Sequence, residues 1–121
     1  MTDPLTLPDF DTYQELALRT ASPQALQDAV TLLNNAALGL SGESGEIADH
    51  VKKVVFHGHA LDDATRDKIA KEIGDVLWYC AMGARGIGVG LGEIATMNIE
   101  KLKKRYPDGF STDNSLHRPH G

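Results

Sequence analysis

The 121-residue sequence contains one cysteine, Cys80, and that scarcity argues against two classes of small protein. A disulfide framework needs cysteines in pairs, and a cysteine-based zinc site needs several thiolates at short spacings. Long apolar runs are also missing, because no segment reaches the ~20 residues that cross a bilayer. The first residues, MTDPLTLPDFD, lack the basic start and the apolar run of a signal peptide. We therefore expect a cytoplasmic protein with no membrane partner.

Basic residues are fewer than acidic ones: 12 Lys and Arg stand against 17 Asp and Glu, for a formal net charge of -5. This balance disfavours polymeric nucleic acid as a partner. A small phosphorylated ligand is compatible with it, since a bound metal ion reverses the local field. The length and the 41% of hydrophobic residues are those of one globular domain. We predict a single domain over residues 1–121, with a core of about 10–111 between a flexible N-terminal lead and a flexible C-terminal tail.

Apolar residues recur at helical spacing in four segments, and no segment has the pattern of a strand. The predicted helices cover residues 9–21, about 24–56, about 63–85 and about 91–105. Ser22 followed by Pro23 is the N-cap pattern that places the start of the long second helix. Pro107 ends the last helix, and the final eleven residues are predicted to be a tail. The fold class is therefore all-α, with a four-helix bundle-like architecture.

Two pairs of acidic residues stand at i, i+3 spacing beside the apolar stripes: Glu43 with Glu46, and Glu72 with Asp75. Residues three apart share one helix face, with Cβ atoms ~5–6 Å apart. If the two stripes pack together, the four carboxylates converge, and without a cation they would repel one another strongly. Oxygen-only ligands suit Mg²⁺ or Mn²⁺. The spacing alone leaves a second interpretation open, in which these are surface acids on amphipathic helices.

Glycines interrupt both acidic pairs, although each glycine costs a helix interior roughly 0.5–1 kcal/mol relative to alanine. Gly42 and Gly45 alternate with the acids of the first pair, and Gly74 separates those of the second. The missing side chains would let another helix, or a phosphate with its metal ion, approach closely. Close packing of two helices without any ligand is the alternative.

Two other kinds of site are less well supported by the sequence. A di-iron carboxylate centre uses Glu-x-x-His on two helices, and neither acidic pair has a histidine at that offset. His50 follows Glu46 by four residues, which is the wrong spacing. No Ser/His/Asp or Cys/His nucleophilic set is evident, so we expect direct attack by water rather than a covalent intermediate.

Four stretches of the sequence together resemble the short single-domain branch of the MazG-like, all-α nucleoside triphosphate pyrophosphohydrolases. They are GLSGESGE (39–46), KK (52–53), EIGDVLWY (72–79) and NIEKLKKRYPDGF (98–110). The family pattern is EExxE, a spacer and then ExxD, and Gly42 stands where the family has its first glutamate. The resemblance covers roughly residues 10–111.

This resemblance implies a Mg²⁺-dependent enzyme, with Mn²⁺ able to substitute, that acts on a nucleotide. Its substrate would be a (deoxy)nucleoside triphosphate, its products the monophosphate and pyrophosphate, and its role the removal of unwanted nucleotides from the pool. By the same analogy the catalytic metal ligands are Glu43, Glu46, Glu72 and Asp75. The resemblance also implies a homodimer or homotetramer. A non-catalytic helical oligomerisation or regulatory module, or a nucleotide sensor, on the same scaffold is the alternative.

Five further residues are candidates for binding the substrate: Asn98, Lys101, Arg105, Lys53 and Trp78. The first three share one face of the last predicted helix and could grip the phosphates, although basic residues are favoured near a helix C-terminus in any case. Lys53 lies near the face of Glu46 and could reach a phosphate, with a solvated pair of lysines as the alternative. Trp78 follows Asp75 by three residues and could lie under a nucleobase, with a core position as the alternative.

Overall fold

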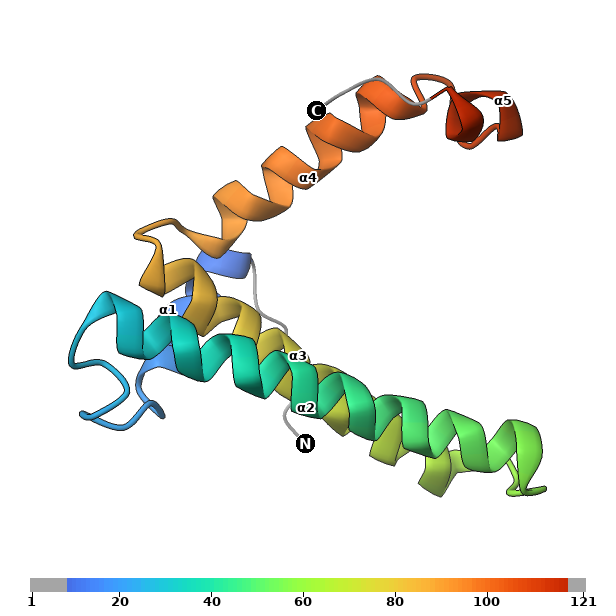
Figure 1. Cartoon of the computed structure of the whole chain (residues 1–121), viewed down its shortest axis with the longest axis horizontal. Helices are drawn as coiled ribbons and strands as arrows, with labels where there is room; N and C mark the ends of the chain where they lie inside the picture. The colour runs from blue at the N-terminus through green and yellow to red at the C-terminus, as the bar shows by residue number, and fades with distance from the viewer. Residues whose placement is uncertain (1–8, 118–121) are drawn as a thin grey trace, which may run out of the picture.

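A computed structural model describes residues 9–117 of the chain, and within that range all regular structure is helical (Figure 1). The helices are α1 (Phe10–Leu18), α2 (Ala29–Phe56), α3 (Asp63–Gly86), α4 (Leu91–Arg105) and α5 (Thr112–Leu116). The predicted all-α class is confirmed. The N-terminal lead, residues 1–8, and the end of the predicted tail, residues 118–121, lie outside the described residues. None of the described helices has both the length and the apolar composition needed to span a membrane.

An aspartate is the N-cap residue of each of the first three helices. Each accepts a hydrogen bond from the backbone N–H three residues further on, and the pairs are Asp9 with Thr12 at 2.7 Å, Asp28 with Thr31 at 2.8 Å and Asp62 with Thr65 at 2.9 Å. Each bond satisfies an N–H group that the first turn of a helix cannot pair internally. The three helix starts are therefore specified by local sequence.

Three of the predicted boundaries are wrong. The first helix ends at Leu18 instead of at residue 21. The second helix begins at Ala29 instead of near Gln24, because Ser22 caps only a turn, in which its hydroxyl accepts a hydrogen bond from the backbone N–H of Ala25 at 3.1 Å. The predicted tail contains the short helix α5, which begins after Ser111. The hydroxyl of Ser111 accepts a hydrogen bond from the backbone N–H of Asn114 at 3.0 Å.

The helices α2 and α3 run side by side in opposite directions and form a long hairpin (Figure 1). Small residues allow this close approach. A Cβ added to Gly86 would lie 2.8 Å from Cγ of Leu33, and a Cβ added to Gly39 would overlap the ring of Tyr79. These two contacts fix the register of the hairpin. In this antiparallel register, the residues that follow Gly39 lie beside the first half of α3.

The helix α4 diverges from the α2–α3 hairpin, so the described chain has the shape of a V (Figure 1). The helix α1 lies at the vertex and contacts both α3 and α4. The buried amide of Gln14 donates to the carbonyls of Ala81 and Val89, at 3.1 and 3.3 Å, and accepts from the N–H of Leu91 at 3.0 Å. Since the N-cap residue of α4 is a glycine, Asp11 of α1 supplies the missing cap by accepting from the N–H of Gly92 at 2.9 Å.

Candidate functional site

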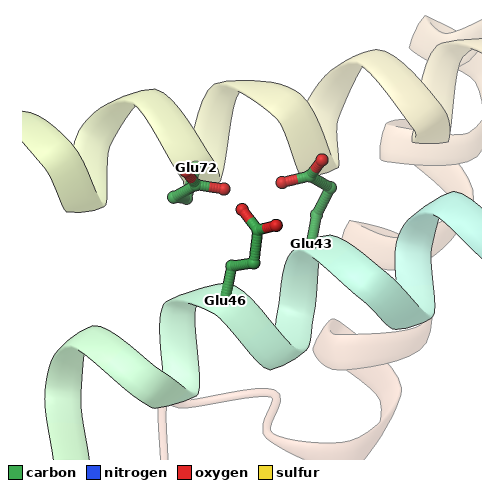
Figure 2. Close-up of side chains that lie close together, drawn as sticks. All are labelled: Glu43, Glu46 and Glu72. Atoms are coloured by element: carbon green, nitrogen blue, oxygen red, sulfur yellow. The ribbon is translucent and has the colours of Figure 1, made fainter.

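Three of the predicted acids meet between α2 and α3 (Figure 2). Glu43 and Glu46 project from successive turns of α2, and Glu72 projects toward them from α3. One carboxylate oxygen of each residue lies within 4.8 Å of those of the other two. The i, i+3 spacing on α2 puts two carboxylates on one face, and the antiparallel register brings the third opposite them. We call Glu43, Glu46 and Glu72 the carboxylate cluster.

The carboxylate cluster holds more negative charge than its surroundings neutralise. Glu43 and Glu72 each have an Oε2 atom that is shielded from solvent and has no hydrogen-bond partner among the described residues. A hydrogen bond with Glu72 and the negative charge of Glu72 raise the pKa of Glu46, since two neighbouring carboxyl groups are stabilised when they share a proton. A shielded carboxylate oxygen without a partner is costly. The donor set, oxygen only and multiply charged, fits a hard divalent cation such as Mg²⁺.

Asp75 lies on α3 one turn after Glu72, outside the three acids whose oxygens meet. It lies near both Glu46 and Tyr13, since its negative charge contributes, after larger causes, to raising the pKa of each group. Burial is the larger cause for the Tyr13 hydroxyl. Tyr13 therefore borders the acids from α1, a proximity for which the sequence carried no signal because it depends on how α1 folds over α3.

The glycines beside the acids face open space within the chain. A Cβ added to Gly42, Gly45 or Gly74 would meet no atom within 4 Å. Gly42 and Gly45 line a surface hollow of about 480 Å³ on α2, next to Glu46 and Asp49. Close packing within the chain therefore does not account for these glycines, in contrast to Gly39. Of the carboxylate cluster, Glu46 lines the hollow and is accessible from that side.

Lys53 is paired with Asp49, one of the residues that line this hollow. Its Nζ atom is 3.0 Å from Oδ2 of Asp49, and Lys52 lies 3.3 Å from Oδ1 of the same residue. The two lysines lower the pKa of Asp49, chiefly through these hydrogen bonds. Both pairs are solvent-exposed, so each contributes little to stability. The side chain of Lys53 thus points back along α2 to Asp49. That Lys53 binds a phosphate stays a prediction.

Trp78 is turned toward the end of α1. Its indole Nε1 donates to the hydroxyl of Thr20 at 2.8 Å and to the carbonyl of Ala17 at 3.3 Å. Its ring meets that of Tyr79 edge-on, with centroids 5.0 Å apart. These contacts place Trp78 where α1 meets α3, and contact with a nucleobase stays a prediction.

The structure does not bring the basic candidates on α4 to the carboxylate cluster of the same chain. Asn98 and Lys101 are exposed on the diverging helix (Figure 1). Arg105, in the last turn of α4, is half-buried, and its Nε has no hydrogen-bond partner among the described residues. The acids and the proposed phosphate ligands therefore lie on different arms of the V.

The family model of the MazG nucleotide pyrophosphohydrolase domain matches residues 33–110, more than half of the chain. The chain belongs to the MazG family. The matched range contains all four predicted metal ligands and the basic residues of α4, and it leaves out α1. MazG proteins are typically metal-dependent, which agrees with the donor chemistry of the carboxylate cluster.

A curated relative of this MazG chain comes from a bacteriophage. The Gene 37 protein of Mycobacterium phage L5 is 35% identical over 102 residues, which cover 82% of this chain and 90% of the phage protein. The name of that relative states no activity. No solved structure matches the chain.

Proposed function

We propose that this MazG protein is a nucleoside triphosphate pyrophosphohydrolase that depends on Mg²⁺, with Mn²⁺ able to substitute. It cleaves the anhydride between the α and β phosphates of a (deoxy)nucleoside triphosphate, consumes one water and releases the monophosphate and pyrophosphate. Its role is to remove unwanted nucleotides from the cytoplasmic pool. Membership of the family supports the reaction class.

The observation that carries the proposal is the carboxylate cluster with its two unpartnered oxygens. Glu43, Glu46 and Glu72 would hold the cation, and Asp75 is one turn away on α3 for a further bond. When bound, Mg²⁺ offsets the charge of the acids, polarises phosphoryl oxygens and lowers the pKa of a bound water. A triphosphate alone would be repelled by these acids, so metal and substrate must bind together.

The side chains of this protein then have two tasks. One carboxylate accepts the proton that the attacking water loses, which general-base catalysis requires. Asn98, Lys101 and Arg105 lie away from the acids of their own chain, so they would donate hydrogen bonds to the phosphates from another chain of the expected homodimer or homotetramer. There they would stabilise the charge that develops on the leaving pyrophosphate. No covalent intermediate is needed, because the described residues provide no activated nucleophile beside the acids.

Product analysis tests the proposal. The purified protein is incubated with each canonical (d)NTP and Mg²⁺, and the products are resolved by ion-exchange chromatography. We expect monophosphate and pyrophosphate in equal amounts. Glu46→Gln should lower the rate at least about 100-fold, because it removes a ligand of an ion worth several kcal/mol to the transition state.

Glu93→Gln is the matched control, since Glu93 is an exposed glutamate in the first turn of α4, away from the acids. It should retain wild-type turnover. Release of a diphosphate and orthophosphate would contradict the proposed bond cleavage. Absence of turnover for every nucleotide with both cations would favour a non-catalytic module or a nucleotide sensor.

A further inference from the structure

The acids of α2 form a row at i, i+3 spacing, and only two of its three members belong to the carboxylate cluster. Glu43 and Glu46 do, whereas Asp49 lies outside the group of acids whose oxygens meet. Asp49 follows Glu46 by three residues, which is ~4.5 Å along the helix axis. The third acid is therefore next to the proposed metal site without being part of it.

Two lysines hold the carboxylate of Asp49. Lys53 Nζ lies 3.0 Å from Oδ2, and Lys52 Nζ lies 3.3 Å from Oδ1. These hydrogen bonds lower the pKa of Asp49 and so keep the carboxyl group charged near neutral pH. Each carboxylate oxygen has two lone pairs, so each can accept one further hydrogen bond. The side chain is 47% exposed, and a ligand can reach it.

A single hollow joins Asp49 to the carboxylate cluster. Its volume of about 480 Å³ is within the range of small-molecule sites, and its lining consists of Gly42, Gly45, Glu46, Asp49 and His50. The two glycines leave the surface of the helix uncovered, since a Cβ added to either would meet no atom within 4 Å. His50 is half-buried and supplies an aromatic ring, the kind of side chain on which nucleobases stack. The hollow is thus suited to a flat ring whose polar edge meets Asp49.

An ionised carboxylate distinguishes the nucleobases by the donors on their Watson–Crick edge, because it only accepts hydrogen bonds. Guanine presents two adjacent donors, N1–H and the N2 amino group, and each can bond to one carboxylate oxygen. Such charge-assisted, bidentate pairs are the stronger kind. Adenine and cytosine have an acceptor nitrogen next to the amino group, and uracil and thymine have one N–H between two carbonyls. In those four bases one carboxylate oxygen would meet a lone pair.

We propose that Asp49 recognises the nucleobase and that guanine nucleotides are the preferred substrates. The base lies in the hollow beside Gly42 and Gly45, and its N1–H and N2 amino group donate to the two oxygens of Asp49. The ammonium group of Lys52 or Lys53 donates to the neighbouring O6 carbonyl of guanine. This selection rests on the proposed function, because the cation at the carboxylate cluster holds the phosphates of the same nucleotide beside Glu46.

Competition between nucleotides tests the proposal. Equimolar dGTP, dATP, dCTP and dTTP are hydrolysed together with Mg²⁺, so the relative rates give the ratios of kcat/KM. We expect dGTP to be preferred at least about tenfold, the discrimination typical of one bidentate pair. Asp49→Asn replaces one acceptor by a donor, which matches xanthine, where a carbonyl replaces the N2 amino group. In a mixture of dGTP and dXTP the preference should therefore change from guanine in the wild type to xanthine in Asp49→Asn.

Asp67→Asn is the matched control. Asp67 is an exposed acid on α3 that pairs with Lys71 at 3.0 Å, a surface pair like that of Asp49, and it does not line the hollow. Its substitution should leave the ratio of dGTP to dXTP hydrolysis unchanged. Equal turnover of the four canonical nucleotides by the wild type would overturn base recognition and leave the proposed function intact. So would an equal loss on dGTP and dXTP in Asp49→Asn, because a merely structural role of Asp49 would have that effect.

Binding decides the question if the wild type hydrolyses no nucleotide. The probes are the α,β-imido analogues of dGTP and dXTP, in which N–H replaces the bridging oxygen, titrated with Mn²⁺ by calorimetry. We expect at least about tenfold tighter binding of the guanine analogue to the wild type and the reverse order in Asp49→Asn. That result without turnover would reject the proposed function and retain base recognition. Equal affinities for the two analogues, or no binding of either, would overturn base recognition.

Discussion

The ring of Tyr79 lies over Gly39, at the point where α3 passes α2 one turn before the first acid of the carboxylate cluster. A Cβ at position 39 would overlap that ring. The ring is itself held edge-on against Trp78, with centroids 5.0 Å apart. The contact sets the separation of the two helices immediately before Glu43, and so helps to set the distance between the acids of α2 and those of α3.

Gly39→Ala should therefore destabilise the fold. Alanine is favoured over glycine in a helix by about 1 kcal/mol, but inserting a methyl group into a filled position costs about 1–3 kcal/mol. We expect a net loss in the free energy of unfolding measured with urea. Gly45→Ala is the matched control, because nothing lies within 4 Å of its Cβ. A loss in Gly39→Ala that persists unchanged in a Tyr79→Leu background would contradict this explanation.

Gly45→Val should damage activity more than helicity. The added side chain meets open space within the chain, so circular dichroism should change little. It would partly fill the hollow beside Glu46, from which the proposed substrate would reach that carboxylate. The measurement is the rate of nucleotide hydrolysis at equal helicity. Wild-type turnover in Gly45→Val would discard the steric role of the glycine.

Gln14→Leu should loosen the start of α4. The substitution leaves the buried carbonyl of Ala81 and the buried N–H of Leu91 without their side-chain partner. Such a loss costs about 1–3 kcal/mol in the free energy of unfolding. Hydrogen exchange at the amide of Leu91 should accelerate as well. Glu15→Leu, which changes the exposed neighbour of Gln14, serves as the control, and an equal effect in both variants would contradict the assignment.

The cap of α2 predicts a dependence of stability on pH. Hydrogen bonds from Thr31 lower the pKa of Asp28 below 3.8, the ordinary value for an aspartate. A carboxyl group whose pKa is lower in the folded state stabilises the fold above its unfolded pKa, and this contribution is lost as the pH falls through the folded pKa. Asp28→Asn keeps a cap but does not titrate. The free energy of unfolding, measured above and below pH 3.8, should fall less on acidification in Asp28→Asn than in the wild type. An equal fall in both proteins would count against the cap.

Much of the local structure could be predicted from the sequence. The bounds of α4, residues 91–105, and the pairing of Glu43 with Glu46 on one face follow from helical spacing and from a proline after the helix. The start of α2 could not be placed, because Ser22 before Pro23 has the sequence of an N-cap and Asp28 is the residue that acts as one. Both are acceptable caps, and packing at the vertex decides between them.

The direction of α4 could not be predicted, because it depends on contacts between residues far apart in the sequence. Gln14 and Asp11 hold the start of α4 from α1, and neither belongs to a recognisable motif. Helical spacing predicts that Asn98 and Lys101 share a face of α4, but it does not predict which acids lie opposite that face. The orientation of Trp78 toward Thr20 likewise depends on tertiary packing.

The central claim is that Glu43, Glu46 and Glu72 together hold a divalent cation, and calorimetric titration of Mn²⁺ into the metal-free protein tests it most directly. We expect saturable binding to the wild type and to Glu93→Gln, and at least about tenfold weaker binding to Glu46→Gln and to Glu72→Gln. Equal affinity in all four proteins would place the cation elsewhere and contradict the account.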